Sequence, residues 1–264
     1  MIALIKWNIW QKRWGIMWWI IGAVSLIFMT LIFYPTFRNQ AAELQRSFDT
    51  LPDAAVQLFG GSTDFFSPVG FLNSQIYFIV LPLLLGILSI NLGNGLIGKE
   101  EQDKTIDNLL SKPISKTKLL TAKAFSGALI LLIVSVSAAL TTIATVKIVK
   151  LDIPLSRIFA ISLICYLLNL SFGAVAFAIS ATGRARVASV GVSMTVALGG
   201  YLLTSLSGTV KWLSTPSKIL PFDYYRSEEI LQGTYRWRNI IYFICLIAIC
   251  GFVSWFSFRK RDLS

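Results

Sequence analysis

Six long apolar stretches without Asp, Glu, Lys or Arg constrain this chain more than any other feature of its sequence. They occupy residues 15–34, 76–97, 124–146, 158–180, 187–206 and 240–258. A bilayer core about 30 Å thick is crossed by about 20 apolar residues in a helix, and each stretch has that length. The sequence therefore predicts an all-α integral membrane protein, with six transmembrane helices in a single transmembrane domain over residues 1–264.

The composition excludes the main alternatives to a membrane protein. Hydrophobic residues make up 55% of the chain and charged residues only 14%, whereas a soluble domain carries about 25% charged residues. A disordered chain would need low hydrophobicity and high charge. The net charge of +11 is explained by basic residues at the cytoplasmic membrane surface, so membrane lipid and not nucleic acid is the expected partner.

The distribution of Lys and Arg between the apolar stretches predicts the orientation. Fourteen of the 24 lie in the amino-terminal tail, segment 98–123, the short connection after the fourth stretch and the carboxyl-terminal tail. These segments total about 55 residues, while the other ten basic residues are spread over about 85. Since the denser side should be cytoplasmic, we expect both termini and segment 98–123 inside the cell. The five basic residues of the last external connection count against this orientation.

The sequence offers no credible catalytic or metal-binding set. It has no histidine, and Cys165, Cys245 and Cys250 all lie within apolar stretches. Membrane metalloproteases use His ligands with a Glu base, and the acidic pair Glu100 and Glu101 has no histidine to join. We therefore expect no enzyme activity of the chain itself, and no metal or cofactor bound by it.

Asn91, Asn94 and Asn169 are the most polar side chains inside the predicted spans. Proton relays and ion-coupled transporters usually rely on ionisable residues within spans, and these spans contain none, which disfavours ion-driven transport. Two interpretations of the asparagines stay open. Either they form interhelical hydrogen bonds, each worth about 0.6 kcal/mol, or they line a weakly polar candidate translocation path.

Residues 93–99 resemble the beginning of a nucleotide-binding loop, with the spacing G-x-x-x-x-G-K. The next position should be Ser or Thr to hold Mg²⁺ but is Glu100, and no predicted strand precedes the glycines. The glycines are better explained by close helix packing, which small residues allow in membranes. If the protein uses ATP, a partner must therefore bind it.

Segment 98–123 is the longest predicted cytoplasmic connection. Ile106, Leu109 and Leu110 are spaced i, i+3 and i+4, so they share one face of a short helix, with charged residues on its other faces. A proline then interrupts that helix, and Ser115 is a suitable cap for a second helix that leads into the third span. The apolar ridge either packs at the membrane interface or docks a cytoplasmic partner.

The same segment resembles a motif of permease subunits of type-two ATP-binding-cassette (ABC) exporters. In that family, the segment between spans two and three typically reads Glu, then Gly-Thr, Leu-Leu-Ser and Pro-Ile-Ser-Arg. The matching residues here are Glu100 or Glu101, Thr105, Ile106, Leu109, Leu110, Ser111, Pro113, Ile114 and Ser115. Lys104 replaces the family's Gly, and Lys116 replaces its Arg, which keeps the charge but loses the planar fork of donors. Shorter likenesses follow in the family's order at residues 58–60, 67–72, 220–224 and 258–263.

The resemblance implies a role for residues 98–123, which we call the coupling segment. It implies that this segment docks in a cleft of a cytoplasmic ABC ATPase subunit, present in two copies, which binds ATP and Mg²⁺. The residues implied in ATPase coupling are Glu100, Glu101, Thr105, Ile106, Leu109, Leu110, Pro113, Ile114 and Lys116.

The resemblance also implies a second permease chain, identical or related, with the translocation path at the interface between the two. It implies a multi-pass protein of a prokaryotic plasma membrane. The uncharged spans favour export of a hydrophobic or amphiphilic substrate. The alternative is a non-transporting membrane scaffold or assembly factor with a permease-like fold.

Overall fold

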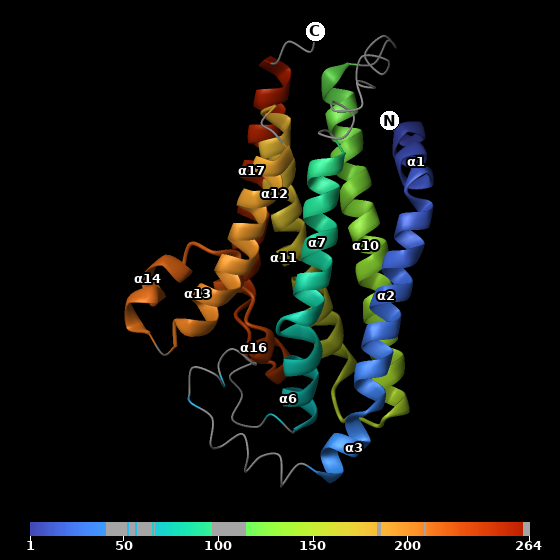
Figure 1. The fold of residues 1–264 in the computed structure, drawn as a ribbon, viewed down its shortest axis with the longest axis vertical. Helices are drawn as coiled ribbons and strands as arrows, with labels where there is room; N and C mark the ends of the chain where they lie inside the picture. The colour runs from blue at the N-terminus through green and yellow to red at the C-terminus, as the bar shows by residue number, and fades with distance from the viewer. Residues whose placement is uncertain are drawn as a thin grey trace.

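The computed structural model describes residues 1–40, 52, 56, 65, 67–96, 115–183, 186–208 and 210–260. These residues form a bundle of long helices, with no strand in any of the described ranges (Figure 1). Both termini lie at one end of the bundle, together with the end of α7 (Val80–Gly95) and the start of α10 (Lys116–Ile148). We call this end the terminal face and the opposite end the distal face.

Six helical segments among the described residues are long and apolar enough to cross a membrane. They are Arg13–Asn39, Pro68–Gly95, Lys116–Ile148, Leu155–Ala181, Ala188–Leu206 and Trp237–Lys260. Each overlaps one of the predicted stretches, so the prediction of six membrane-spanning helices is confirmed by length and composition.

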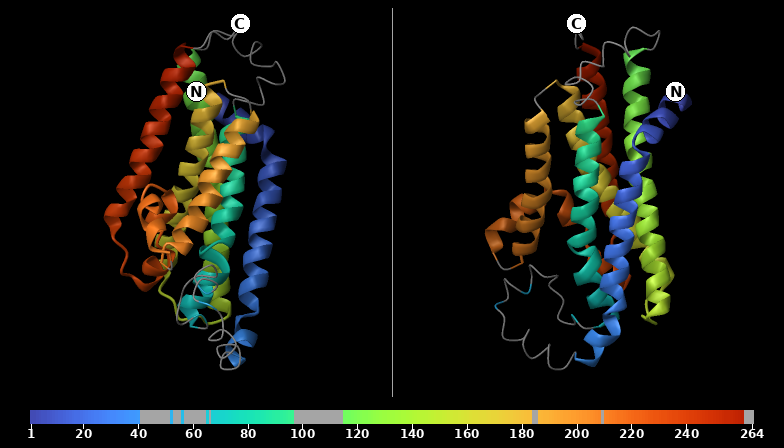
Figure 2. Two further views of the ribbon diagram at one scale, coloured as in Figure 1. Left: turned by 60° about the vertical axis from the view of Figure 1, so that its left-hand side comes forward. Right: turned by 45° about the vertical axis from the view of Figure 1, so that its right-hand side comes forward.

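Several of these segments are built from more than one helix. The first span consists of α2 (Arg13–Ile32) and α3 (Tyr34–Asn39), and the second of α6 (Pro68–Leu72), the π-helical turn η1 (Asn73–Tyr77) and α7. The third span is α10 and the fourth is α11 (Leu155–Ala181). The fifth consists of α12 (Arg186–Met194), the π-helical turn η2 (Thr195–Gly199) and α13 (Gly200–Leu206), and the sixth of η4 (Trp237–Asn239) and α17 (Ile240–Lys260). A further helix, α1 (Ile2–Gln11), precedes α2 and is inclined to it in the right-hand view of Figure 2.

Short helices connect the fifth and sixth spans near the distal face. They are η3 (Lys211–Leu213), α14 (Ser214–Ser217), α15 (Pro221–Tyr224) and α16 (Ser227–Gln232). The side chain of Arg157 on α11 donates a hydrogen bond to the carbonyl oxygen of Leu231 at 2.9 Å, which fastens α16 to the bundle.

The core of the bundle lies along α7 and α11. In an 18-residue apolar window of each span, 61% is buried in the second span, 50% in the third and fourth, and only 17–22% in the first, fifth and sixth. In Figures 1 and 2, α12 and α13 lie on one side of α7 and α10 on the other. The outer helices therefore present much of their apolar surface outward, as expected for contact with lipid or with another chain.

The second span begins eight residues before its predicted start, at Pro68 instead of residue 76. The polar residues Asn73, Ser74 and Gln75 interrupt the apolar pattern, but the helix continues through them. Ser67 caps it, because its hydroxyl oxygen accepts the N–H of Gly70 at 3.0 Å. Pro68 stands at the first helical position, where its missing N–H has no cost.

Candidate functional site

Most of the predicted coupling residues lie outside the described residues. These are Glu100, Glu101, Thr105, Ile106, Leu109, Leu110, Pro113 and Ile114. The structure does describe Lys116, which is half-buried in the first turn of α10. The hydroxyl oxygen of Ser115 accepts the N–H of Lys118 at 3.3 Å, which confirms the predicted cap of this helix. The structure therefore describes the end of α7, which precedes the coupling segment, and the last part of the segment, which forms the first turns of α10.

A buried lysine links these two helices at the terminal face. The ammonium of Lys123 on α10 donates to the carbonyl oxygen of Leu96, the residue that ends α7, at 2.6 Å. Lys123 is only 3% exposed. A cation at a helix C-terminus satisfies carbonyl groups that have no partner within the helix and is favoured by the helix dipole. The last residue of the coupling segment is thereby held against the end of α7.

Sequence reasoning missed the role of Lys123, which it counted only among the basic residues that set the orientation. A usable signal was present in the spacing Leu119-Leu120-x-x-Lys123. Both leucines are buried, so a lysine three or four residues later lies on the same buried helix face.

An apolar cluster surrounds this link and joins four helices. It consists of Leu96, Leu120, Phe177, Ala181 and Phe258, with Trp255 packed against it. These side chains belong to α7, α10, α11 and α17. A displacement of the coupling segment would therefore reach all four helices through packed side chains rather than through α7 and α10 alone.

Two glycines set the distance between α7 and α11. A Cβ on Gly93 would overlap the carbonyl oxygen of Gly173, and a Cβ on Gly173 would overlap the hydroxyl of Ser89. The hydroxyl of Ser89 donates to the carbonyl oxygen of Asn169 across the same contact at 2.5 Å. The interpretation of the nucleotide-loop-like glycines as helix-packing residues is confirmed at Gly93. It is wrong at Gly95, where an added Cβ would meet nothing within 4 Å, and Gly98 lies outside the described residues.

The three asparagines of the candidate translocation path lie in different surroundings. Asn91 is exposed on α7, whereas Asn94 and Asn169 are fully buried within the subunit. Asn169 donates to the carbonyl oxygen of Cys165 at 2.8 Å, within its own helix. Neither amide atom of Asn94 has a hydrogen-bond partner. The structure therefore does not bring the three together on one surface, and their role in a path stays a prediction.

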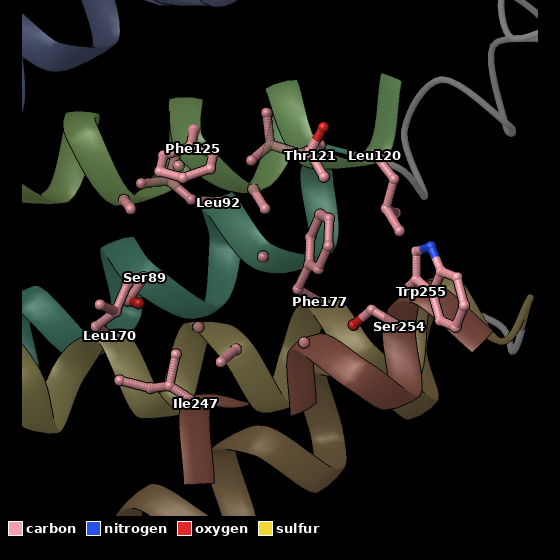
Figure 3. Close-up of a pocket in the computed structure, with 18 residues that line it drawn as sticks. Ser89, Leu92, Leu120, Thr121, Phe125, Leu170, Phe177, Ile247, Ser254 and Trp255 are labelled. Atoms are coloured by element: carbon pink, nitrogen blue, oxygen red, sulfur yellow. The ribbon is translucent and has the colours of Figure 1, made fainter. Parts of the chain in front are cut away.

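An apolar pocket of about 290 Å³ lies beside this region, between α7, α10, α11 and α17 (Figure 3). Leu92, Phe125, Leu170, Phe177 and Ile247 contribute hydrocarbon to its walls. Phe125 is 56% exposed, so the pocket reaches the surface of the subunit along α10. Its volume is roughly twice that of an apolar cavity that takes up benzene, for which about 150 Å³ suffices.

The hydroxyl groups that line the pocket are already engaged. Ser89 donates to Asn169 as described above, Thr121 donates to the carbonyl oxygen of Thr117 at 2.9 Å, and Ser254 donates to that of Cys250 at 2.6 Å. Their hydrogens are therefore directed at backbone carbonyls and not into the pocket. The pocket presents hydrocarbon to whatever enters it, and suits an apolar chain or ring.

Replacing Lys123 with methionine should lower the free energy of unfolding by about 1–2 kcal/mol, because the carbonyl of Leu96 loses a charged donor in a buried setting. The matched control is Lys118→Met, which removes an exposed lysine from the first turn of the same helix. Thermal unfolding of the purified variants in detergent compares the two. Equal stability of both variants would contradict a structural role for Lys123.

A protein-family model matches this chain. The model of the family described as ABC-2 family transporter protein matches residues 13–263, which is nearly the whole chain. No curated protein and no solved structure was found to match. Family membership and six apolar helices together indicate a multi-pass membrane protein with a role in transport. Permeases of this kind generally work with an ABC ATPase subunit and are not themselves catalytic. The chain is a member of the ABC-2 family of transporter proteins.

Proposed function

We propose that this chain is the membrane-spanning subunit of an ATP-driven exporter, which moves a hydrophobic or amphiphilic substrate out of the cytoplasm. A separate ATPase would bind ATP and Mg²⁺ and dock on the coupling segment. The observation that carries the proposal is the Lys123–Leu96 hydrogen bond, which joins the last residue of that segment, on α10, to the end of α7 beside a four-helix apolar cluster. Movement of a docked ATPase would thus displace the four helices of the cluster together.

The proposed orientation places the terminal face in the cytoplasm. The termini share that face with the end of α7 and the start of α10, which agrees with the orientation predicted from the density of basic residues. The proposed docking surface then lies on the side where ATP is available.

A second permease chain is part of the proposal, and Asn91 supports it. A carboxamide exposed to hydrocarbon lacks the hydrogen bonds that it makes in water, and that loss costs several kcal/mol. Asn91 is exposed on α7, within the second span. A second chain, or a weakly polar path between two chains, would supply hydrogen-bond partners there.

The apolar pocket supports a hydrophobic or amphiphilic substrate. Gly251 lines it, and a Cβ at that position would meet no atom within 4 Å. Gly251→Leu should therefore add hydrocarbon at the wall of the pocket without a clash at its Cβ. We expect it to abolish stimulation of ATP hydrolysis by apolar compounds while the protein still folds. Gly22→Leu on α2 is the matched control, since it also has free space and lies outside the pocket. Equal stimulation of both variants would exclude the pocket as the substrate site.

The test of the proposed function is purification of the chain from its native membrane, followed by mass spectrometry of the associated protein and of any bound small molecule. We expect a P-loop ATPase, with vanadate-sensitive ATP hydrolysis when the pair is reconstituted in lipid. An ATPase that copurifies but never responds to lipid, peptide or amphiphile would favour the scaffold alternative. Absence of an ATPase would overturn the proposal.

A further inference from the structure

An open groove of about 550 Å³ runs along the first span where it lies beside the third. One wall is a single face of α1 and α2, on which the lining residues recur at helical spacing, among them Lys6, Trp10, Arg13, Met17 and Ile20. The other wall belongs to α10, which runs beside α1 and α2 in Figures 1 and 2. We call this feature the N-terminal groove. It shares no lining residue with the pocket of Figure 3.

A buried hydrogen bond fixes the two walls of the groove relative to each other. The side-chain amide of Asn8 on α1 donates to the hydroxyl oxygen of Ser126 on α10 at 3.1 Å, and Asn8 is only 9% exposed. Helix α1 ends at Gln11 and α2 begins at Arg13, so the chain changes direction at Lys12 while α1 stays attached to α10. The groove is therefore part of the folded subunit and does not need a ligand in order to form.

The end of the groove nearest the terminal face is basic. Lys6 and Arg13 are exposed there, and neither forms an ion pair with a residue that the structure describes. The guanidinium of Arg13 lies 3.9 Å from the ring centroid of Trp10 and donates to the carbonyl oxygen of Trp10 at 3.0 Å, which leaves further N–H donors for a ligand. Residues 1–42 and 116–148, which include both walls, contain no Asp or Glu. A phosphate group would thus meet two cations and no carboxylate of these segments.

Tryptophan side chains place this basic end at the level of the lipid headgroups. Trp7 and Trp10 stack with ring centroids 5.6 Å apart, and both are more than half exposed, as is Trp14 at the start of α2. Tryptophan is enriched where a membrane meets water, and the long side chains of Lys and Arg reach from that level toward polar groups. The two cations therefore lie where phosphate groups of the bilayer are found.

The remainder of the groove is apolar and descends toward the middle of the membrane. Met17 and Ile20 line it from α2, and Ile133 lines it from α10. The seven residues from Arg13 to Ile20 span about 10 Å of helix, while one leaflet contributes about half of a bilayer core that is about 30 Å thick. An acyl chain can therefore follow the groove for much of its length. Cations above hydrocarbon match the two parts of an anionic phospholipid, in the order in which a leaflet presents them.

We propose that the N-terminal groove is a binding site for an anionic phospholipid. Lys6 and Arg13 bind its phosphate, and one acyl chain lies along Met17, Ile20 and Ile133. A zwitterionic phosphatidylcholine fits less well, because its quaternary ammonium would add a third positive charge beside the two cations. The site goes beyond the proposed function and depends neither on ATPase coupling nor on the orientation of the chain. It can therefore be tested on the permease chain alone.

Native mass spectrometry of the full chain, released from detergent micelles, measures the Kd of dioleoyl phosphatidylglycerol. Dioleoyl phosphatidylcholine and glycerol 3-phosphate are the comparison ligands, and we expect both to bind more weakly. Combining Lys6→Gln with Arg13→Gln should raise the Kd of phosphatidylglycerol about thirtyfold, which is about fivefold for each charge near the membrane surface. The matched control combines Arg259→Gln with Lys260→Gln. These two exposed cations also lie over aromatic rings at the terminal face but do not line the groove, so the control should bind like the wild type.

A second variant tests the apolar part of the groove without changing charge. Ile133→Trp should obstruct the path of the acyl chain and raise the Kd about tenfold, because contact with about two methylene groups is worth that factor. Leu140→Trp is its control, since Leu140 is exposed two turns further along α10 and outside the groove.

Four results would overturn the proposal. Equal affinity for phosphatidylcholine would show that the cations do not select the lipid, and equal affinity for glycerol 3-phosphate would show that the acyl chain is not bound. Equal losses in the two charge variants would indicate a general effect of net charge. A dimer that Ile133→Trp dissociates while phosphatidylglycerol binding persists would show that a second copy of the chain occupies the groove.

Discussion

Replacing Gly93 with alanine is expected to lower the melting temperature and the yield of folded protein, although alanine is the better helix former. The added Cβ would overlap the carbonyl oxygen of Gly173 and lie 3.0 Å from the Cβ of Ala176. The carbonyl oxygen of Gly173 belongs to the backbone and cannot move away as the end of a flexible side chain can. Therefore α7 and α11 must separate, which also breaks the Ser89–Asn169 hydrogen bond. Overpacking costs about 1–3 kcal/mol and the lost bond about 1 kcal/mol, against about 1 kcal/mol gained in helix propensity.

The control for this experiment lies two residues away on the same helix. A Cβ on Gly95 would meet nothing within 4 Å, so Gly95→Ala should be neutral or stabilising by up to about 1 kcal/mol. Fluorescence-detected gel filtration of detergent extracts heated to increasing temperatures compares the two variants with the wild type. If both variants have the same melting temperature, the close approach of α7 and α11 does not limit stability.

The double substitution Leu109→Asp and Leu110→Asp is expected to release the ATPase and abolish transport. Burial of the three aliphatic side chains of the apolar ridge would contribute at most about 4.5–9 kcal/mol of contact energy. A ligand must favour one state by about 5.5 kcal/mol to drive a two-state equilibrium from 1:99 to 99:1. Two carboxylates on the ridge would remove most of this contact and add a desolvation cost. Copurification with the ATPase, followed by vanadate-sensitive ATP hydrolysis, measures the effect.

Asn108→Asp provides a matched control for the ridge. It adds the same carboxylate at the neighbouring position, on a face that a helical repeat turns about 100° from Leu109. This variant should retain the ATPase at the wild-type level. Retention of the ATPase by the double variant would show that the coupling segment does not dock through its apolar ridge, whereas loss in both variants would indicate a general effect of added negative charge.

The sequence was sufficient to predict the spans, because length and the absence of charge determine what can cross a bilayer. Their ends were harder to predict. The extension of the second span to Pro68 depends on a Ser-Pro cap that outweighs three polar residues. The π-helical turns η1 and η2 follow from tertiary packing, for which hydropathy carries no signal.

The candidate site could be predicted only in part. The glycine contact at Gly93 and the cap at Ser115 follow from local chemistry, and the structure bears out both. The partner of Lys123 and the separate environments of Asn91 and Asn94 depend on which helix faces are covered. In a chain whose spans are apolar all round, periodicity does not distinguish the inner face from the outer one. The apolar pocket and the N-terminal groove also depend on how side chains from different helices meet.

The length of α10 has a consequence for any complex that this chain forms with an ATPase. Its 33 residues give a rod of about 50 Å, longer than the 40–45 Å or so that a bilayer measures with its headgroups. A rod of this length either crosses the bilayer at a tilt or extends beyond the headgroups as a rigid stalk. With the end at Lys116 beyond the membrane surface, an ATPase docked there would act at a distance from the lipid. Because the helix is continuous, a small tilt at that end would displace α10 across the whole thickness of the bilayer.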